Sequence, residues 1–169
     1  MKKSSIHSVV YQIWPRSFND SNDDGIGDIQ GIIQKLDYLK YLGIDQIWLS
    51  PVFVSPNKDY GYDIQDYYNI QPEFGSLEDM DILISESKKR DIKIIMDLVA
   101  NHTSDQHPWF QEALKDKNSK YRDFYFFREG KNNQEPNNWI SLFGGSAWTK
   151  VAGEENRYYL SLFTPNQCD

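Results

Sequence analysis

Three clusters of polar residues in this chain have the types and the spacing that binding or catalysis requires. The first runs from Asp20 to Asp28 and carries side-chain oxygens at alternate positions around glycines. A hard cation such as Ca2+ needs several oxygen ligands at once. Five groups could supply them: Asp20, Asn22, Asp24, Asp28 and the backbone carbonyl of Ile26. Gly31 stands where an EF-hand carries its bidentate glutamate, so the loop is not an EF-hand, and a solvent-exposed acidic turn is the alternative.

The second and third clusters each follow a segment with the character of a strand. In the run from Lys58 to Asp63, Asp59 and Tyr62 could hydrogen-bond to a sugar and stack on it, although an ordinary turn with exposed tyrosines has the same composition. In the third cluster, Asp97 interrupts an apolar segment and is followed by Asn101 and His102. Burying a carboxylate is costly unless it is paired, so Asp97 is expected to have a partner.

The elements that must position these clusters alternate along the chain. Strands are predicted over 9–14, 44–49 and 92–99, and the last is an almost continuous apolar run that indicates burial on both faces. Apolar residues at helical spacing predict a helix over 29–42, and a capping box beginning at Ser76 predicts a second one. Residues 52–75 are interpreted as a long loop. The order strand, helix, strand, helix, strand favours a parallel α/β sheet. Parallel barrels place their sites at the carboxyl ends of the strands, where all three clusters are expected to lie.

Beyond residue 101 the chain becomes rich in loops, with a short helix predicted near 108–114 and a strand over 157–163. We interpret this part as a separate, irregular subdomain.

Composition excludes several classes of protein. Hydrophobic residues make up 39% and aromatic residues 15% of the 169 residues, which excludes a disordered chain. The net charge of −7 and the lack of a visible basic face argue against nucleic acid as a partner. No apolar run is long enough for a signal peptide or a membrane span, so a cytoplasmic location without a membrane partner is expected. Cys168 is the single cysteine and cannot form an intrachain disulfide.

Several motifs together resemble the start of the oligo-1,6-glucosidases and related α-glucosidases of the α-amylase family. They include VVYQIWPRSF, DSNDDGIGD, GIDQIWLSPVFVSP, DYGYDI, DLVANHTSDQHPWF and EPNNWISLFGGSAW, and the likeness runs from about residue 9 to residue 167. The resemblance implies an α/β fold, a partial TIM (β/α)8 barrel. Residues 1–101 would form its first three βα units, and residues 102–169 the start of a loop-rich subdomain inserted after the third strand.

The resemblance also implies roles for individual residues of a retaining α-glycosidase. Asp59, Tyr62 and His102 would surround the terminal glucosyl unit of a short α-glucoside. Asp97 would support the site from beneath, with Asn101 in the same motif. Phe143 and Phe163 would form walls of the pocket. A structural Ca2+ would occupy the loop from Asp20 to Asp28.

Two departures from the family pattern bear on the substrate and on the end of the chain. Tyr60 stands where Asn is common, and Gln167-Cys168-Asp169 resembles a Gln-Pro-Asp segment with Cys in place of Pro. The family's nucleophile and acid/base resemble residues that follow the fourth and fifth strands, so the chain is expected to be an inactive fragment on its own. Its parent could be an α-1,6- or α-1,4-glucosidase, a trehalose-6-phosphate hydrolase or a sucrose isomerase. A non-catalytic sugar-binding or regulatory domain is the alternative from another class.

Overall fold

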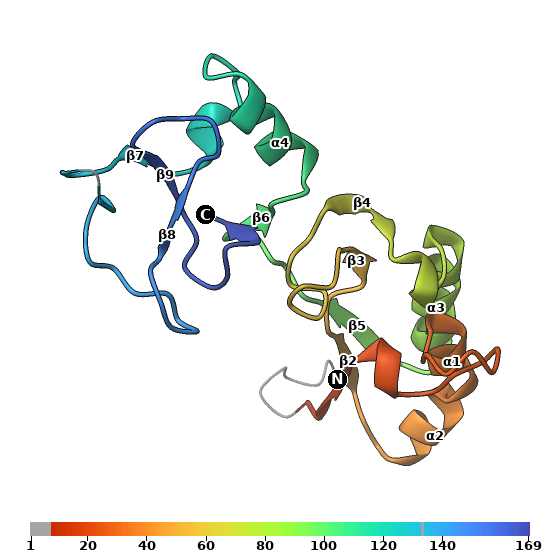
Figure 1. Cartoon of the computed structure of the whole chain (residues 1–169). Helices are drawn as coiled ribbons and strands as arrows, with labels where there is room; N and C mark the ends of the chain where they lie inside the picture. Colours follow the sequence, from red (N-terminus) through yellow and green to blue (C-terminus); the bar gives the residue numbers. More distant parts are fainter. Residues whose placement is uncertain (1–7, 133) are drawn as a thin grey trace. The chain divides into compact units, whose positions relative to one another are not determined.

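The computed structural model describes residues 8–132 and 134–169. The first seven residues of the predicted barrel segment and Asn133 of the predicted subdomain lie outside this range. The chain divides into two compact units, and Figure 1 labels most of their elements. The first unit comprises residues up to 54 and 67–98, and the second comprises 55–66 and 99–169. The division differs from the predicted boundary at residue 101 because the segment 55–66 packs with the second unit, where the backbone N–H of Ser104 donates to the carbonyl of Ile64.

A three-stranded parallel sheet forms the centre of the first unit. Its strands are β1 (Val10–Ile13), β2 (Gln46–Leu49) and β5 (Lys93–Met96), in the order β1-β2-β5. The two crossovers contain α1 (Ile29–Gln34) with α2 (Leu36–Tyr41), and α3 (Leu77–Lys89). The predicted alternation of strands and helices and the parallel pairing are confirmed.

The helices follow their sequence signals with one exception. Ser76 and Asp79 form the predicted capping box at the start of α3, each side chain accepting a hydrogen bond from the other's backbone N–H. Asp28 caps α1 by accepting from the backbone N–H of Gly31 at 2.6 Å. The single helix predicted over 29–42 is interrupted at Lys35, whose ψ of 3° is not helical. No glycine or proline marks this break.

One face of the sheet carries the core, and the described residues leave the other face largely uncovered. Ile13, Ile47 and Leu49 are buried against side chains of the helices. The alternate side chains are exposed or half-buried; Ile95 is 39% exposed. The prediction that residues 92–99 are buried on both faces was therefore wrong for this structure. The apolar run shows that the side chains of this strand favour burial. Their actual burial depends on a covering layer, which the described residues do not provide on that face.

The region 52–75 is more regular than the predicted loop. It contains β3 (Phe53–Val54), which pairs with β4 (Asp66–Ile70), and the short 3-10 helix η3 (Pro72–Phe74). Another 3-10 helix, η2 (Pro15–Ser17), follows β1. Two tyrosines and an isoleucine give β4 the composition of a strand, and Pro72 follows its end.

The second unit is built around a small antiparallel sheet and a helix. The sheet joins β7 (Phe127–Glu129), β9 (Arg157–Leu160) and β8 (Trp148–Lys150) in the order β7-β9-β8. A separate pair links β6 (Thr103–Ser104) to β10 (Gln167–Cys168). The helix α4 (Pro108–Lys115) confirms the predicted short helix, and η4 (Arg122–Phe124) follows it. The predicted strand over 157–163 ends at residue 160.

Aromatic packing holds the second unit together. The ring of Phe110 on α4 lies 5.0 Å from the rings of both Tyr125 and Tyr159. Cys168 is buried in the same cluster, and this burial raises the pKa of its thiol, as expected for an unreactive cysteine. Within residues 8–132 and 134–169, no helix is long and apolar enough to cross a membrane.

Candidate functional site

A buried carboxylate organises the turn that carries Asp59 and Tyr62. Asp63 is fully buried and accepts three hydrogen bonds: from the Ser55 hydroxyl at 2.9 Å and from the backbone N–H groups of Lys58 at 2.9 Å and Asp59 at 3.0 Å. These bonds close the chain into a tight turn and fix the backbone of Asp59.

The middle of this turn requires an unusual backbone conformation. Tyr60 has φ of 51° and Gly61 has φ of 98°. Glycine adopts positive φ without strain, and asparagine tolerates it better than most residues, whereas tyrosine does not. The departure from the family pattern at Tyr60 therefore falls at a backbone position that favours the more common Asn.

His102 connects the turn to the rest of the second unit. Its ring is buried, with Nε2 3.0 Å from the carbonyl oxygen of Tyr62 and Nδ1 3.3 Å from the amide nitrogen of Asn101. Since that amide nitrogen is a donor, we assign the tautomer in which Nδ1 accepts and Nε2–H donates to Tyr62. The histidine ring is thereby oriented from both sides.

Gln167 is a further member of this cluster that the sequence did not single out. Its amide nitrogen donates to the Asp59 carboxylate at 2.9 Å and lies 3.1 Å from Nε2 of His102. The side chain is only 1% exposed, and the pairing of β10 with β6 brings it to His102. The resemblance of residues 167–169 to a Gln-Pro-Asp segment was the available signal.

Two predicted aromatic residues lie next to this cluster. The Phe163 ring centroid lies 5.1 Å from that of His102 and 6.0 Å from that of Phe143. Phe143 is largely exposed. The structure therefore brings together Asp59, the backbone of Tyr62, His102, Phe163 and Phe143, and it combines carboxylate, amide and imidazole groups with a flat apolar surface.

Asp97 and Asn101 each have a hydrogen-bond partner, which was expected for Asp97. Asp97, directly after β5 in the first unit, is half-buried and accepts from the indole N–H of Trp48 at 2.6 Å. Asn101, in the second unit, donates to the carboxylate of Asp169 in addition to contacting His102. The buried Asp169 carboxylate also accepts from the backbone N–H of Leu162 at 2.6 Å.

The loop from Asp20 to Asp28 curls through successive side-chain-to-backbone hydrogen bonds. Asp20 accepts from the backbone N–H groups of Gly25, Asn22 and Asp23, and these bonds, the one from Gly25 most of all, lower the pKa of its carboxyl. Asn22 accepts from Asp24 at 3.0 Å.

The oxygen atoms of the loop that remain available as metal ligands decide whether it could hold a cation. Asp24 accepts from the backbone N–H of Ile26 at 2.8 Å, and Asp28 accepts from the Ser21 hydroxyl at 2.7 Å. In the described part of the chain, no three acidic, histidine or cysteine side chains are grouped as metal ligands. A cation in this loop would therefore depend on the amide oxygen of Asn22 and the carbonyl of Ile26 as well as on carboxylates.

Comparisons with known proteins agree with the architecture and extend over nearly the whole chain. The family model of the α-amylase catalytic domain matches residues 12–169. The oligo-1,6-glucosidase of Parageobacillus thermoglucosidasius is 60% identical over 164 residues, which cover 96% of this chain and 29% of that protein. The trehalose-6-phosphate hydrolase of Bacillus subtilis (strain 168) is 53% identical over 163 residues, with the same coverage of 96% and 29%.

Solved structures give the same result. The crystal structure of isomaltulose synthase from Klebsiella sp. LX3 superposes with a TM-score of 0.93 at 59% identity, covering 96% of this chain and 29% of that one. The chain thus spans less than a third of the length of these relatives. Because the family model matches all but the first eleven residues, this chain belongs to the α-amylase catalytic-domain family.

Proposed function

We propose that the chain is the N-terminal part of a retaining α-glucosidase that hydrolyses short α-1,6- or α-1,4-linked gluco-oligosaccharides. The observation that carries the proposal is the Asp59 carboxylate, hydrogen-bonded to Gln167, with the oriented His102 ring and the Phe163 ring next to it, in a chain of this family. Carboxylate, amide and imidazole groups can exchange hydrogen bonds with sugar hydroxyls, and an aromatic ring can cover the apolar face of a pyranose.

Within the proposal, the three parallel strands are the first three units of a (β/α)8 barrel, and residues 102–169 begin an inserted subdomain. The 29% coverage of the relatives supports this, because a TIM barrel typically needs about 250 residues.

The residues of this chain then bind the substrate rather than cleave it. A retaining glycosidase requires a nucleophile and an acid/base whose carboxyl groups lie about 5–5.5 Å apart. We assign these groups to the part of the protein beyond Asp169. Asp59 and His102 would hold hydroxyls of the terminal glucosyl unit, and Phe163 and Phe143 would line its pocket.

A second reaction class is favoured by one specific observation. The isomaltulose synthase at 59% identity is about as similar to this chain as the oligo-1,6-glucosidase at 60%. A parent enzyme that isomerises sucrose would use the same glucosyl-binding residues and differ where the leaving group is held.

A structural Ca2+ in the loop from Asp20 to Asp28 belongs to the same proposal. The mixture of carboxylate, amide and carbonyl oxygens suits a hard cation. The ion would hold the first loop in place and would take no part in the reaction.

The test compares nitrophenol release from a nitrophenyl α-glucoside by the full-length protein and by residues 1–169 alone. The full-length protein should be active and residues 1–169 inactive, since removing groups that act as a unit costs several orders of magnitude in rate. In the full-length protein, Asp59→Asn and His102→Ala should lower kcat/KM at least a hundredfold. Tyr41→Ala, at a helix position that is 91% exposed, serves as the control and should change little. Turnover by residues 1–169 near the full-length rate would refute the proposal, whereas saturable sugar binding without turnover by the full-length protein would favour a sugar-binding domain.

A further inference from the structure

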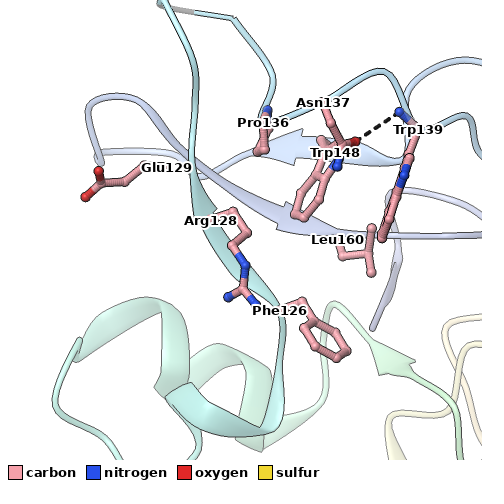
Figure 2. A pocket seen from close by; sticks show the side chains of 8 residues that line it. All are labelled: Phe126, Arg128, Glu129, Pro136, Asn137, Trp139, Trp148 and Leu160. Carbon is pink, nitrogen blue, oxygen red and sulfur yellow. Dashed lines mark hydrogen bonds between the residues drawn. The ribbon is translucent and has the colours of Figure 1, made fainter.

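A cavity of about 540 Å³ lies in the second unit, over the sheet formed by β7, β8 and β9. It shares no lining residue with the cluster around His102. Its volume falls within the roughly 300–1,000 Å³ typical of sites for small ligands. Figure 2 shows the side chains that line it, among them Trp139, Trp148, Phe126, Arg128 and Asn137.

Two tryptophans form a fixed aromatic wall of this cavity. The rings of Trp139 and Trp148 are stacked, 6.1 Å apart at 22°. Trp148 is buried, whereas Trp139 is 55% exposed. The side-chain oxygen of Asn137 accepts from the backbone N–H of Trp139 at 3.0 Å (Figure 2). It also accepts from the indole N–H of Trp148 at 2.8 Å. The backbone of Trp139 and the Trp148 ring on which its indole stacks are therefore positioned before a ligand arrives, which lowers the entropic cost of binding.

The other side of the cavity supplies polar groups of both signs. The Arg128 guanidinium lies 5.8 Å from the centroid of the Phe126 ring and donates to the carbonyl of Phe127 at 2.9 Å. Glu129 also lines the cavity, and its carboxylate lies 3.5 Å from Arg157. Arg128 has five N–H donors in all, so several are left for a ligand.

The pairing of these groups identifies the chemistry of the ligand. The lining residues include one cation, Arg128, and one anion, Glu129, which already pairs with Arg157, so the indole wall and the hydrogen-bonding groups beside it identify the ligand better than net charge does. A neutral molecule that has an apolar face and hydroxyls around its edge matches an indole wall with donors and acceptors beside it. We propose that this cavity is a carbohydrate-binding site for a neutral pyranose of an oligosaccharide, with Trp139 as the stacking platform. The inference goes beyond the proposed function, since it is drawn from the lining of the cavity and needs no catalytic group.

Calorimetric titration with isomaltotriose and with maltotriose tests this in the full-length protein. The titration uses an Asp59→Ala background, so that sugar bound by the His102 cluster does not mask the second site. This background should retain saturable binding of at least one trisaccharide. Trp139→Ala should weaken that binding at least tenfold, and Trp139→Phe, which keeps a flat ring, should restore most of it. Tyr41→Ala is the matched control for loss of an exposed aromatic residue and should leave binding unchanged.

The outcomes separate this inference from the proposed function. Loss of all trisaccharide binding in the Asp59→Ala background would overturn the inference, as would equal affinities with and without Trp139→Ala. Circular dichroism of each variant shows whether it is folded, and Trp139→Phe provides the test if Trp139→Ala is not. Hydrolysis of the nitrophenyl α-glucoside by the unsubstituted protein reports on the proposed function independently of either result.

Discussion

Asp63 should be the most important single side chain for the turn that carries Asp59. Its carboxylate is fully buried and accepts from the Ser55 hydroxyl and from the backbone N–H groups of Lys58 and Asp59. Hydrogen bonds to a charged acceptor contribute about 1.5–3 kcal/mol each, and leaving a buried donor unsatisfied costs about 1–3 kcal/mol. Three such bonds would sum to about 4.5–9 kcal/mol. Because the two backbone donors are only partly buried and can be rehydrated, and because the substitution removes the cost of burying a carboxylate, we expect Asp63→Ala to lower the unfolding free energy by less than this sum suggests, about 3–6 kcal/mol.

Asp63→Asn separates the loss of hydrogen bonds from the loss of volume. The amide keeps one acceptor oxygen, which can still serve Ser55 and Asp59 as Oδ1 does now. Its NH2 group would face the backbone N–H of Lys58, and two donors cannot form a hydrogen bond. We therefore expect Asp63→Asn to lower the unfolding free energy by about 1–3 kcal/mol.

Urea unfolding of the two variants measures the difference. Asp81→Ala, at an exposed position of α3, is the control and should remain within about 0.5 kcal/mol of the unsubstituted protein. The reasoning fails if Asp63→Ala behaves like this control, or if Asn proves as destabilising as Ala.

Three further outcomes are expected. His107 caps α4 by accepting from the backbone N–H of Trp109, and burial lowers the pKa of its ring despite the nearby charge of Asp66. The unfolded chain therefore binds the proton more readily than the folded chain does. The stability that the neutral His107 ring contributes is present above pH about 6.5 and is lost as the pH falls below it. His107→Asn should accordingly show a smaller drop in urea midpoint between pH 7.5 and 5.5 than the unsubstituted protein, and equal drops would contradict the assignment. Residues 1–169 alone should self-associate through the edge strand β5. In sedimentation velocity, Ile95→Lys should reduce this self-association more than the control Ile84→Lys on the surface of α3. A monomer of unsubstituted residues 1–169 that melts cooperatively would argue against the prediction. Asp24→Ala should weaken Ca2+ binding at least tenfold by calorimetry in the full-length protein while Asp23→Asn does not, and an unchanged affinity in Asp24→Ala would exclude the loop as the site.

The sequence alone identified the features that depend on neighbouring residues. The capping box at Ser76 is formed as predicted because its partners are three residues apart. The first strands and helices were recognised from short-range patterns, and their order implied the parallel pairing that the structure confirms. The family followed from ordered motifs, each of which is local, and it directed attention to Asp59, His102 and Phe163.

Tertiary structure decided the features that depend on residues far apart along the chain. Gln167 reaches Asp59 across 108 positions because β10 pairs with β6, and no local pattern encodes that pairing. Asp63 was not singled out within the run from Lys58 to Asp63, yet it is fully buried, since burial depends on what packs around a residue. The apolar run of residues 92–99 likewise indicated two covered faces, while the residues that the structure describes pack closely on one of them. A residue's own type sets its preference for burial, but only the folded chain determines whether another layer is present to bury it.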